Sequence, residues 1–261
     1  MYTFKLLLTL IKINIQQDLA YRTDAIINIL VNLMWLGWEL LSLSILFSNT
    51  NTLGGWGPGE LIALLGVFRL VNMLVAALIW PNTEKFNASV RDGTLDYTLL
   101  QPANSLLLVS FSRIIVWRVW DIVLATILIV TGIGMSGGSI APLSVISFLL
   151  LVVSGAAIIY SLWIVMIAFT FWFIKFDYNV TILQALMEAG RYPATVYPTW
   201  LRLIVTFVVP IAVATTVPLQ ALRGDLSDWQ VLLFFGVGVA SVLIAWRVWK
   251  AGVRRYSSAS S

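Results

Sequence analysis

The sequence predicts an all-α integral membrane protein with six transmembrane helices. Of its 261 residues, 60% are hydrophobic and only 11% are charged, too few charges to cover a soluble protein of this length. A helix of about 20 apolar residues crosses the hydrocarbon core of a bilayer. Six stretches are long enough, and the predicted spans are residues 25–47, 61–80, 114–135, 143–174, 201–218 and 231–249. The fourth stretch exceeds one perpendicular crossing and should tilt or project.

Residues 1–22 precede the first span and predict an interfacial amphipathic helix. One narrow strip of its surface holds the polar residues Lys5, Thr9, Lys12 and Gln16. Apolar side chains cover the opposite side, although Asn14 and Asp18 intrude on it. A helix with this pattern lies flat on the membrane surface. No small-residue cleavage site follows, which argues against a signal peptide.

The positions of lysine and arginine predict the orientation of the spans. Basic residues gather in the N-terminal segment, in the loops 81–113 and 175–200 with their flanks, and in the C-terminal tail. The three alternate loops together contain one basic residue, Arg223. Because basic residues mark the cytoplasmic side, both termini are predicted in the cytoplasm, and we read the positive charge as topological rather than as a nucleic-acid-binding surface.

The chain has neither histidine nor cysteine. This composition excludes histidine-based general-base catalysis, thiol nucleophiles and the usual zinc, haem and iron–sulfur sites, so no metal site is predicted. The string G-M-S-G at 134–137 is similar to the nucleophile motif of intramembrane serine proteases, but the base is missing, and a turn is the better interpretation. No nucleotide-binding P-loop occurs.

The hydrophilic segment 87–105, NASVRDGTLDYTLLQPANS, predicts two short helices across the inner membrane surface. Gly93 ends the first helix, and Thr94 caps the second with Asp96 in its first turn. Pro102 disfavours helix at the residue before it. Charged and apolar side chains would then stand together on a partner-docking surface: Arg91, Asp92, Leu95, Asp96, Tyr97 and Leu99.

Three segments make the chain resemble a known family: RDGTLDYTLLQPANS, EAGRYPATVYPTWLR and VVPIAVATTVPLQAL. The chain resembles the membrane subunit of an ABC-2 type transporter, in the subgroup with G-x-L-D-x-x-L-x-x-P and G-R-Y-P signatures. The similarity runs over essentially the whole chain and implies one ABC-2 transmembrane domain, residues 1–261, in a bacterial-type inner membrane. It also implies two separately encoded ATPase subunits, which bind ATP and Mg, and a second permease that is the same or homologous. No cofactor is expected in this chain.

The resemblance also implies roles for individual residues. The coupling helix, which meets the ATPase, corresponds to the signature positions Asp92, Gly93, Leu95, Asp96, Tyr97, Leu99 and Pro102, and we include the preceding Arg91. A cytoplasmic elbow corresponds to Gly190, Arg191, Tyr192 and Pro193. The family has no common substrate, so the resemblance does not name the cargo. We expect an amphiphilic or polymeric cargo that is exported.

Four charged residues fall inside predicted spans. Glu39 and Arg69 each lie about eight or nine residues from the outer end of their span, or ~12 to 14 Å inward. An unpaired charge at that depth is costly, so this matched depth predicts either a pair or a watery cavity that contacts cargo. Arg118 and Asp121, three residues apart on one helix face, are predicted to pair.

Two other classes of function compete with an ABC permease. A self-contained secondary transporter or channel would couple cargo to an ion through buried acids, but only Glu39 lies deep and only Asp121 lies at shallow depth. Neither acid adjoins a predicted helix break, where such sites usually occur. An intramembrane enzyme is disfavoured by the missing histidine and cysteine. Co-purification of an ATPase would separate the permease from both rivals.

Overall fold

The computed structural model describes residues 2–20, 22–137, 140–172 and 179–256. In these ranges the regular elements are helices and no strand is formed. Five helices are long and apolar enough to cross a membrane, and a pair bent by 90° makes a sixth if it is counted as one span. The predicted class, an all-α membrane protein, is confirmed.

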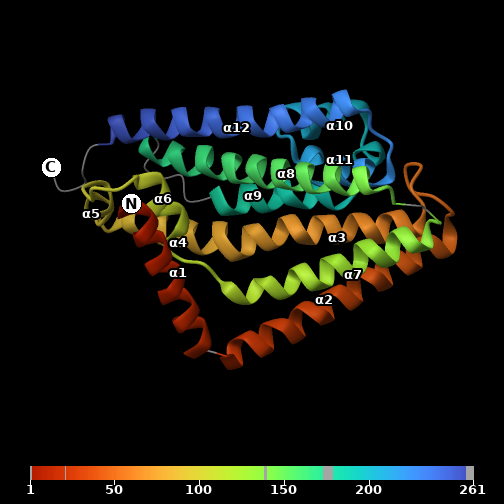
Figure 1. Cartoon of the computed structure of the whole chain (residues 1–261), viewed down its shortest axis with the longest axis horizontal. Helices are drawn as coiled ribbons and strands as arrows, with labels where there is room; N and C mark the ends of the chain where they lie inside the picture. The colour runs from red at the N-terminus through yellow and green to blue at the C-terminus, as the bar shows by residue number, and fades with distance from the viewer. Residues whose placement is uncertain (1, 21, 138–139, 173–178, 257–261) are drawn as a thin grey trace.

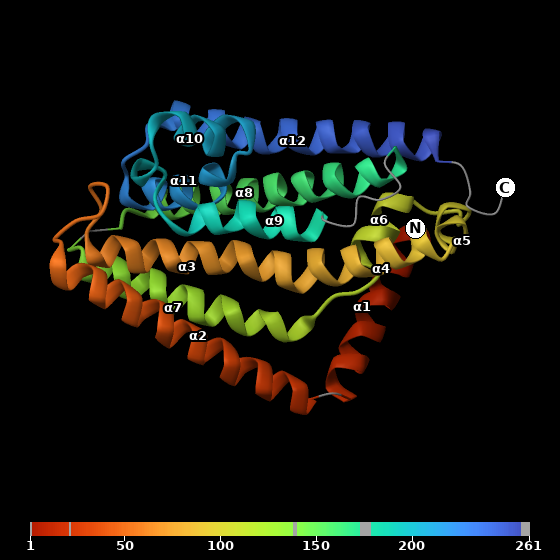
Figure 2. The same ribbon diagram turned by 180° about the vertical axis from the view of Figure 1, so that it is seen from behind.

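The long helices run side by side along the molecule (Figure 1). α2 and α12 lie on opposite edges, with α3 and α8 between them, and the view from behind shows the same order (Figure 2). We call one end of the molecule the α5 end and the other, with residues 50–57, the loop end. The bounds of the long helices are α2 Arg22–Asn49, α3 Pro58–Leu74, α7 Trp120–Met135, α8 Pro142–Ala168 and α12 Asp228–Arg255.

The backbones of α3 and α7 touch because both helices carry glycine where they meet. A Cβ atom added at Gly66 would lie 2.7 Å from the carbonyl oxygen of Ala125, closer than any real contact. The other glycines at this contact are Gly59 and Gly132. Small residues that allow close approach are a typical basis of helix packing in membranes. The centre of α8 fills the core behind them with buried Ile158, Ile159, Trp163, Ile164 and Ile167.

The second predicted span continues well beyond residue 80. α3 passes through a π-helical turn, Val75–Ile79, into α4, Trp80–Arg91. Pro81 has no amide hydrogen for the carbonyl of Ala77, and that carbonyl instead accepts the amide of Ile115 at 2.9 Å. Polar residues end the hydropathy signal near Trp80 but do not end the helix, so the predicted boundary was too early.

Asn82 fixes the loop that returns from α6 (Ser105–Phe111) to α7. Its amide donates to the carbonyls of Ser110 and Arg113 at 2.9 and 2.7 Å, and its side-chain oxygen accepts the amide of Arg113 at 2.9 Å. The side chain is buried, and its polar atoms are bonded as burial requires. The start of α7 therefore has a fixed position relative to α4.

The predicted fifth span is wrong as a single straight helix. α10 (Thr199–Leu203), a π-helical turn (Ile204–Val208) and α11 (Ile211–Arg223) form the pair bent by 90°. Pro210 stands at the break, where it cannot continue a helical hydrogen-bond ladder. This apolar segment is therefore either a broken span or a re-entrant loop.

The predicted fourth loop contains a core helix. α9, Asn179–Glu188, packs its buried Leu183 and Met187 into the main hydrophobic cluster. These two residues are one helical turn apart, and four polar residues of this short helix, Asn179, Thr181, Gln184 and Glu188, lower its mean hydropathy. The segment was therefore mistaken for a surface connector. The last predicted residues of the fourth span, 173–174, lie outside the described ranges.

α1, Tyr2–Ala20, runs obliquely from the α5 end to the start of α2 (Figure 1). Its intruding polar residues face the protein: Asn14 and Asp18 are buried, while Leu8 and Leu19 are exposed. The Asp18 carboxylate accepts the amide of Val116 at 2.6 Å, which ties α1 to the chain before α7. Contact of the exposed side with lipid remains a prediction.

Candidate functional site

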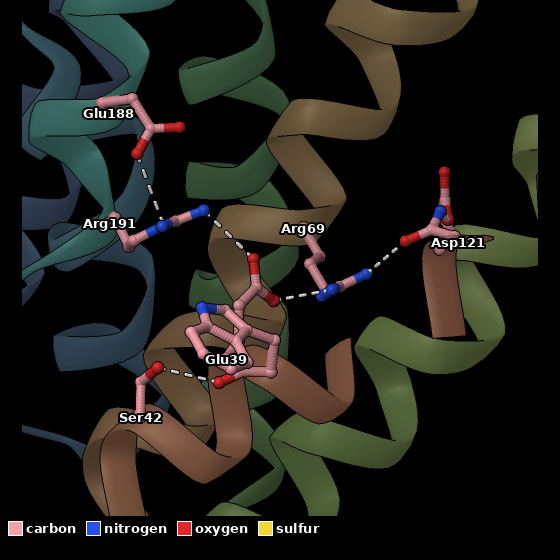
Figure 3. Close-up of polar contacts among 8 residues, drawn as sticks. Glu39, Ser42, Arg69, Asp121, Glu188 and Arg191 are labelled. Atoms are coloured by element: carbon pink, nitrogen blue, oxygen red, sulfur yellow. Dashed lines mark hydrogen bonds and ion pairs between the residues drawn. The ribbon is translucent and has the colours of Figure 1, made fainter. Parts of the chain in front are cut away.

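A network of charged and amide side chains joins four separate elements (Figure 3). Arg69 on α3 lies 2.6 Å from the Glu39 carboxylate on α2 and donates to the side-chain oxygen of Asn32 at 2.7 Å. The Asn32 amide in turn donates to Asp121 on α7 at 2.6 Å. Arg191, just after α9, lies 3.1 Å from the other oxygen of Glu39. One carboxylate is thus held between two guanidinium groups.

The electrostatics of this network explain its connectivity. The side chain of Arg69 is only 9% exposed, so its charge requires a counter-charge and hydrogen-bond acceptors close by. Glu39 supplies the charge and Asn32 supplies a neutral acceptor, which avoids a second buried acid beside Arg69. Arg191 also lies over the ring of Phe68, with its guanidinium carbon 5.7 Å from the ring centre. Arg118 and Asp121, at 3.5 Å, extend the network toward the α5 end.

These residues line a cavity of about 360 Å³ between α2, α3 and α7, which we call the arginine cavity. Its polar wall consists of Asn28, Asn32, Glu39, Arg69, Asn72, Arg118, Asp121 and Arg191. Its apolar wall consists of Val31, Trp35, Phe68, Met73, Ala76 and Trp80. Among the described residues, no three acidic side chains converge as a metal site would need.

A second candidate feature is the short helix α5, Leu95–Leu99, at one end of the molecule. Gly93 has φ of +68°, the left-handed conformation that lets the chain turn sharply after α4. Leu95 is 1% exposed and belongs to the main hydrophobic cluster, against which Leu99 also packs. Tyr97 points the other way and is 74% exposed.

A family model for ABC-2 family transporter proteins matches residues 33–260. The chain belongs to this family. The resemblance of the sequence to an ABC-2 permease is thereby confirmed, and the chain is the membrane subunit of an ABC transporter. Comparison with curated proteins and with solved structures finds no match.

The permease brings together some of the predicted intramembrane charges and adds residues that sequence reasoning missed. Matched depth predicted either a pair or a watery cavity for Glu39 and Arg69; the two charges meet at 2.6 Å, and both also line a cavity. Asn32 was missed, although it lies seven residues before Glu39, on the same face of α2. Arg191 was predicted as part of a cytoplasmic elbow, and its contact with Glu39 was not foreseen.

The predicted elbow is not at the end of the permease where the sequence put it. Gly190 packs against Ile211 of α11, and Arg191 reaches Glu39. A little further on, the Thr195 hydroxyl donates to the carbonyl of Gly54 at 2.8 Å. Tyr192 and Pro193 connect these contacts, so the G-R-Y-P segment leads to the loop end instead of the α5 end. The physical reason is α9, which carries the chain back along the core.

The predicted coupling segment has the correct helix break at Gly93 but a different distribution of side chains. Leu95 and Leu99 are four residues apart and share the inward face, so they cannot stand beside Tyr97 on one surface. No side-chain capping bond forms at Thr94. The exposed residues of segment 91–104 are Arg91, Asp92, Thr94, Tyr97, Leu100, Gln101, Pro102 and Asn104.

Proposed function

We propose that this permease moves an amphiphilic or polymeric cargo outward through the inner membrane with a second permease, the same or homologous. ATP would be hydrolysed, with Mg, on two separate ATPase subunits that dock at the α5 end. Membership of the ABC-2 family supports the general role. The observation that carries the coupling assignment is α5, a short helix that is anchored in the core on one face and bare on the other.

The outward side of α5 exposes two large apolar side chains, although it lies outside the predicted membrane spans. Tyr97 and Leu100 are 74% and 82% exposed, and charged Arg91 and Asp92 are exposed beside them. An aromatic and an aliphatic side chain surrounded by charge are typical of a protein-binding surface. On the inward side, Leu95 fixes the helix to the transmembrane core. A force applied to Tyr97 would therefore be transmitted to the spans.

Asp96 belongs to the internal contacts of this end. Burial raises the pKa of the Tyr256 hydroxyl, and the negative charge of Asp96 nearby raises it further. Asp96 thus acts on the C-terminal end of α12. We therefore move the proposed ATPase contact from Leu95 and Asp96 to Tyr97 and Leu100, and treat the first two as anchors of the helix.

Basic residues support a cytoplasmic position for the α5 end. Those at or next to this end are Lys85, Arg91, Arg113, Lys250, Arg254 and Arg255. Arg202 donates to the carbonyl of Thr195 and so belongs to the loop end, together with Arg223. Removing Arg191 and Arg202 lowers the number of basic residues assigned to the cytoplasmic side but leaves a clear excess of positive charge at the α5 end. Both termini would then be cytoplasmic.

The test is to purify the tagged permease from its host and measure ATP hydrolysis in the preparation. Tyr97→Asp and Leu100→Asp should each lower the recovered ATPase at least about tenfold, because a charge is placed at the centre of an apolar contact. Thr52→Asp, an exposed change at the loop end, is the matched control and should not lower it.

Equal recovery in all three variants would contradict the docking assignment. Absence of any ATPase from the unmodified preparation would favour the alternative, a self-contained secondary transporter or channel. That alternative needs acids free to exchange protons or ions. Glu39 and Asp121 are instead both engaged by arginine.

A further inference from the structure

We propose that the arginine cavity binds the anionic headgroup of an amphiphile, with Arg69 and Arg118 as its ligands. The proposal rests on the proposed function for its biological meaning, since it names the chemical class of the cargo. It rests on the cavity alone for its physical argument. The chemistry recognised is a phosphate or carboxylate that is joined to an apolar chain.

The charge of the cavity wall favours an anion. Three arginines, Arg69, Arg118 and Arg191, face two carboxylates, Glu39 and Asp121, which leaves a surplus of one positive charge. Glu188 lies 3.5 Å from Arg191 but is mostly exposed and is not part of the wall. A surplus positive charge in a partly enclosed cavity favours binding of an anion.

Hydrogen-bond donors in the cavity are also left over. The Nε atom of Arg69 is buried and has no hydrogen-bond partner, whereas the Nε atom of Arg191 lies 3.5 Å from the Glu188 carboxylate. Arg118 makes one long contact to Asp121, at 3.5 Å, and its side chain remains 31% exposed. A network that served only to neutralise its own charges would use these donors. Guanidinium groups in a fixed orientation match the oxygens of phosphate and carboxylate.

The shape and lining of the cavity favour an amphiphile over a soluble anion. Indole and phenyl rings of Trp35, Trp80 and Phe68 stand beside the charged groups. The volume of about 360 Å³ suits a headgroup and the first part of a chain. A second cavity shares Glu39 and Arg191 with the first and continues between α2 and α3 with leucines: Leu43, Leu46, Leu61 and Leu65.

A third cavity shares Leu43 with the second and reaches the loop end. It is lined mostly by apolar residues, among them Phe47, Ile62 and Met135. Three separate cavities therefore follow one another along α2 and α3, and their walls become more apolar toward the loop end. The Glu39–Arg191 contact stands between the polar and the apolar parts, as the boundary between headgroup and chain in a bound amphiphile would.

The cysteine-free chain allows a direct binding test on the full-length protein. Asn72, one turn from Arg69, faces the cavity and is exposed, so Asn72→Cys gives a reporter thiol. Its rate of reaction with the neutral reagent N-ethylmaleimide is measured in the neutral detergent dodecyl maltoside. The probes are dodecyl phosphate, dodecyltrimethylammonium and inorganic phosphate. Thr52→Cys at the loop end is the control thiol.

Dodecyl phosphate should slow labelling of Asn72→Cys at least about fivefold and leave Thr52→Cys unchanged, while dodecyltrimethylammonium should not protect. Adding Arg118→Gln should raise the concentration needed for protection about tenfold, the usual effect of losing a charged hydrogen bond. Arg118→Lys keeps the charge but loses the planar guanidinium that donates two parallel hydrogen bonds, so it should raise this concentration by an intermediate factor. Arg247→Gln, the same charge change on the exposed side of α12, should have no effect.

Arg118→Gln is preferred to Arg69→Gln because Asp121 keeps its hydrogen bond from Asn32 and the fold should survive. The site would be overturned if the cationic and anionic probes protected equally, or if Arg118→Gln left the concentration needed for protection unchanged. Protection by inorganic phosphate alone would assign a soluble anion and overturn the amphiphile. None of these readouts uses ATP hydrolysis, so failure here and failure of ATPase co-purification are separate results.

Discussion

The two neighbouring helices α2 and α3 are both apolar enough to span a membrane, yet they are held in opposite ways. In the most apolar part of α3 and its continuation, 72% of the residues are buried, whereas in the corresponding part of α2 none is. α3 meets α7 backbone to backbone at Gly66. α2 stands at the edge and is joined to the core by Asn32 and Glu39.

The difference shows which forces act between helices in a membrane. Lipid tails are as apolar as leucine, so apolar side chains alone give little reason for one helix to leave lipid for another. Close backbone packing holds α3, whereas α2 is held by hydrogen-bonded charges together with a few partly buried side chains such as Leu36 and Leu40. Breaking each type of contact should therefore affect stability differently, and the predictions below run from the largest expected effect to the smallest.

Loss of the central charge pair should have the largest effect. Glu39→Gln should lower the free energy of unfolding by about 3 kcal/mol, because it removes the counter-charge of buried Arg69, and Arg69→Met should cost somewhat less, because Glu39 keeps Arg191. The double variant should recover part of the loss, since Arg191 keeps Glu188. The measurement is a double-mutant cycle on thermal stability in detergent. Strictly additive losses would rule out direct coupling of the two charges.

The glycine contact should come next, and it provides a matched comparison. Gly66→Ala places a methyl group against the Ala125 backbone and should cost about 1 to 3 kcal/mol. Gly37→Ala on α2 meets nothing within 4 Å and should be neutral or stabilising, by up to about 1 kcal/mol of helix propensity. Equal effects would mean that α2 is packed as α3 is.

The tether of α1 should have a smaller effect. Asp18→Asn weakens acceptance of the Val116 amide and removes the charge that lies 3.6 Å from Arg113, at a cost of about 1 kcal/mol. Asp24→Asn, an exposed change at the start of α2, is the control and should stay within about 0.5 kcal/mol. Thermal stability in detergent distinguishes them, and a larger loss for Asp24→Asn would contradict the tether.

The last prediction concerns topology and should leave stability unchanged. Thr195→Cys should react with a membrane-impermeant thiol reagent from the same side as Thr52→Cys, because Thr195 contacts Gly54. Thr94→Cys, beside α5, should react only after the membrane is opened. Labelling of Thr195→Cys together with Thr94→Cys would restore the original charge count and contradict the path of α9.

Most features that depend on neighbouring residues were predicted correctly, whereas most features that depend on contacts between distant segments were not. Hydropathy located most spans, and the fixed rise of a helix put Glu39 level with Arg69. Hydropathy and rise are both local properties of a single helix, so the sequence is enough to use them. Arg191 could not be found in this way, since its place depends on α9, whose apolar residues are too few to register as a span. Turn chemistry at Gly93 was local and was predicted correctly.

Other errors came from incomplete use of a local signal. Helical periodicity alone puts Leu95 and Leu99 on one face and Tyr97 on the other. The sequence analysis placed all three residues on one docking surface because all three are largely apolar, and it did not use their spacing along the helix. The contacts of Asn82, by contrast, depend on how a distant loop returns to α4, and its neighbours in sequence give no sign of it.

The unbroken helix from Pro58 to Arg91 has a consequence for access to α5. Its 34 residues are roughly 50 Å long at 1.5 Å per residue, about 20 Å more than the hydrocarbon core of a bilayer. If the start of α3 lies at one surface of the bilayer, the polar residues of α4 would extend beyond the hydrocarbon core on the other side and hold α5 outside it. A water-soluble protein could reach Tyr97 there without displacing any lipid.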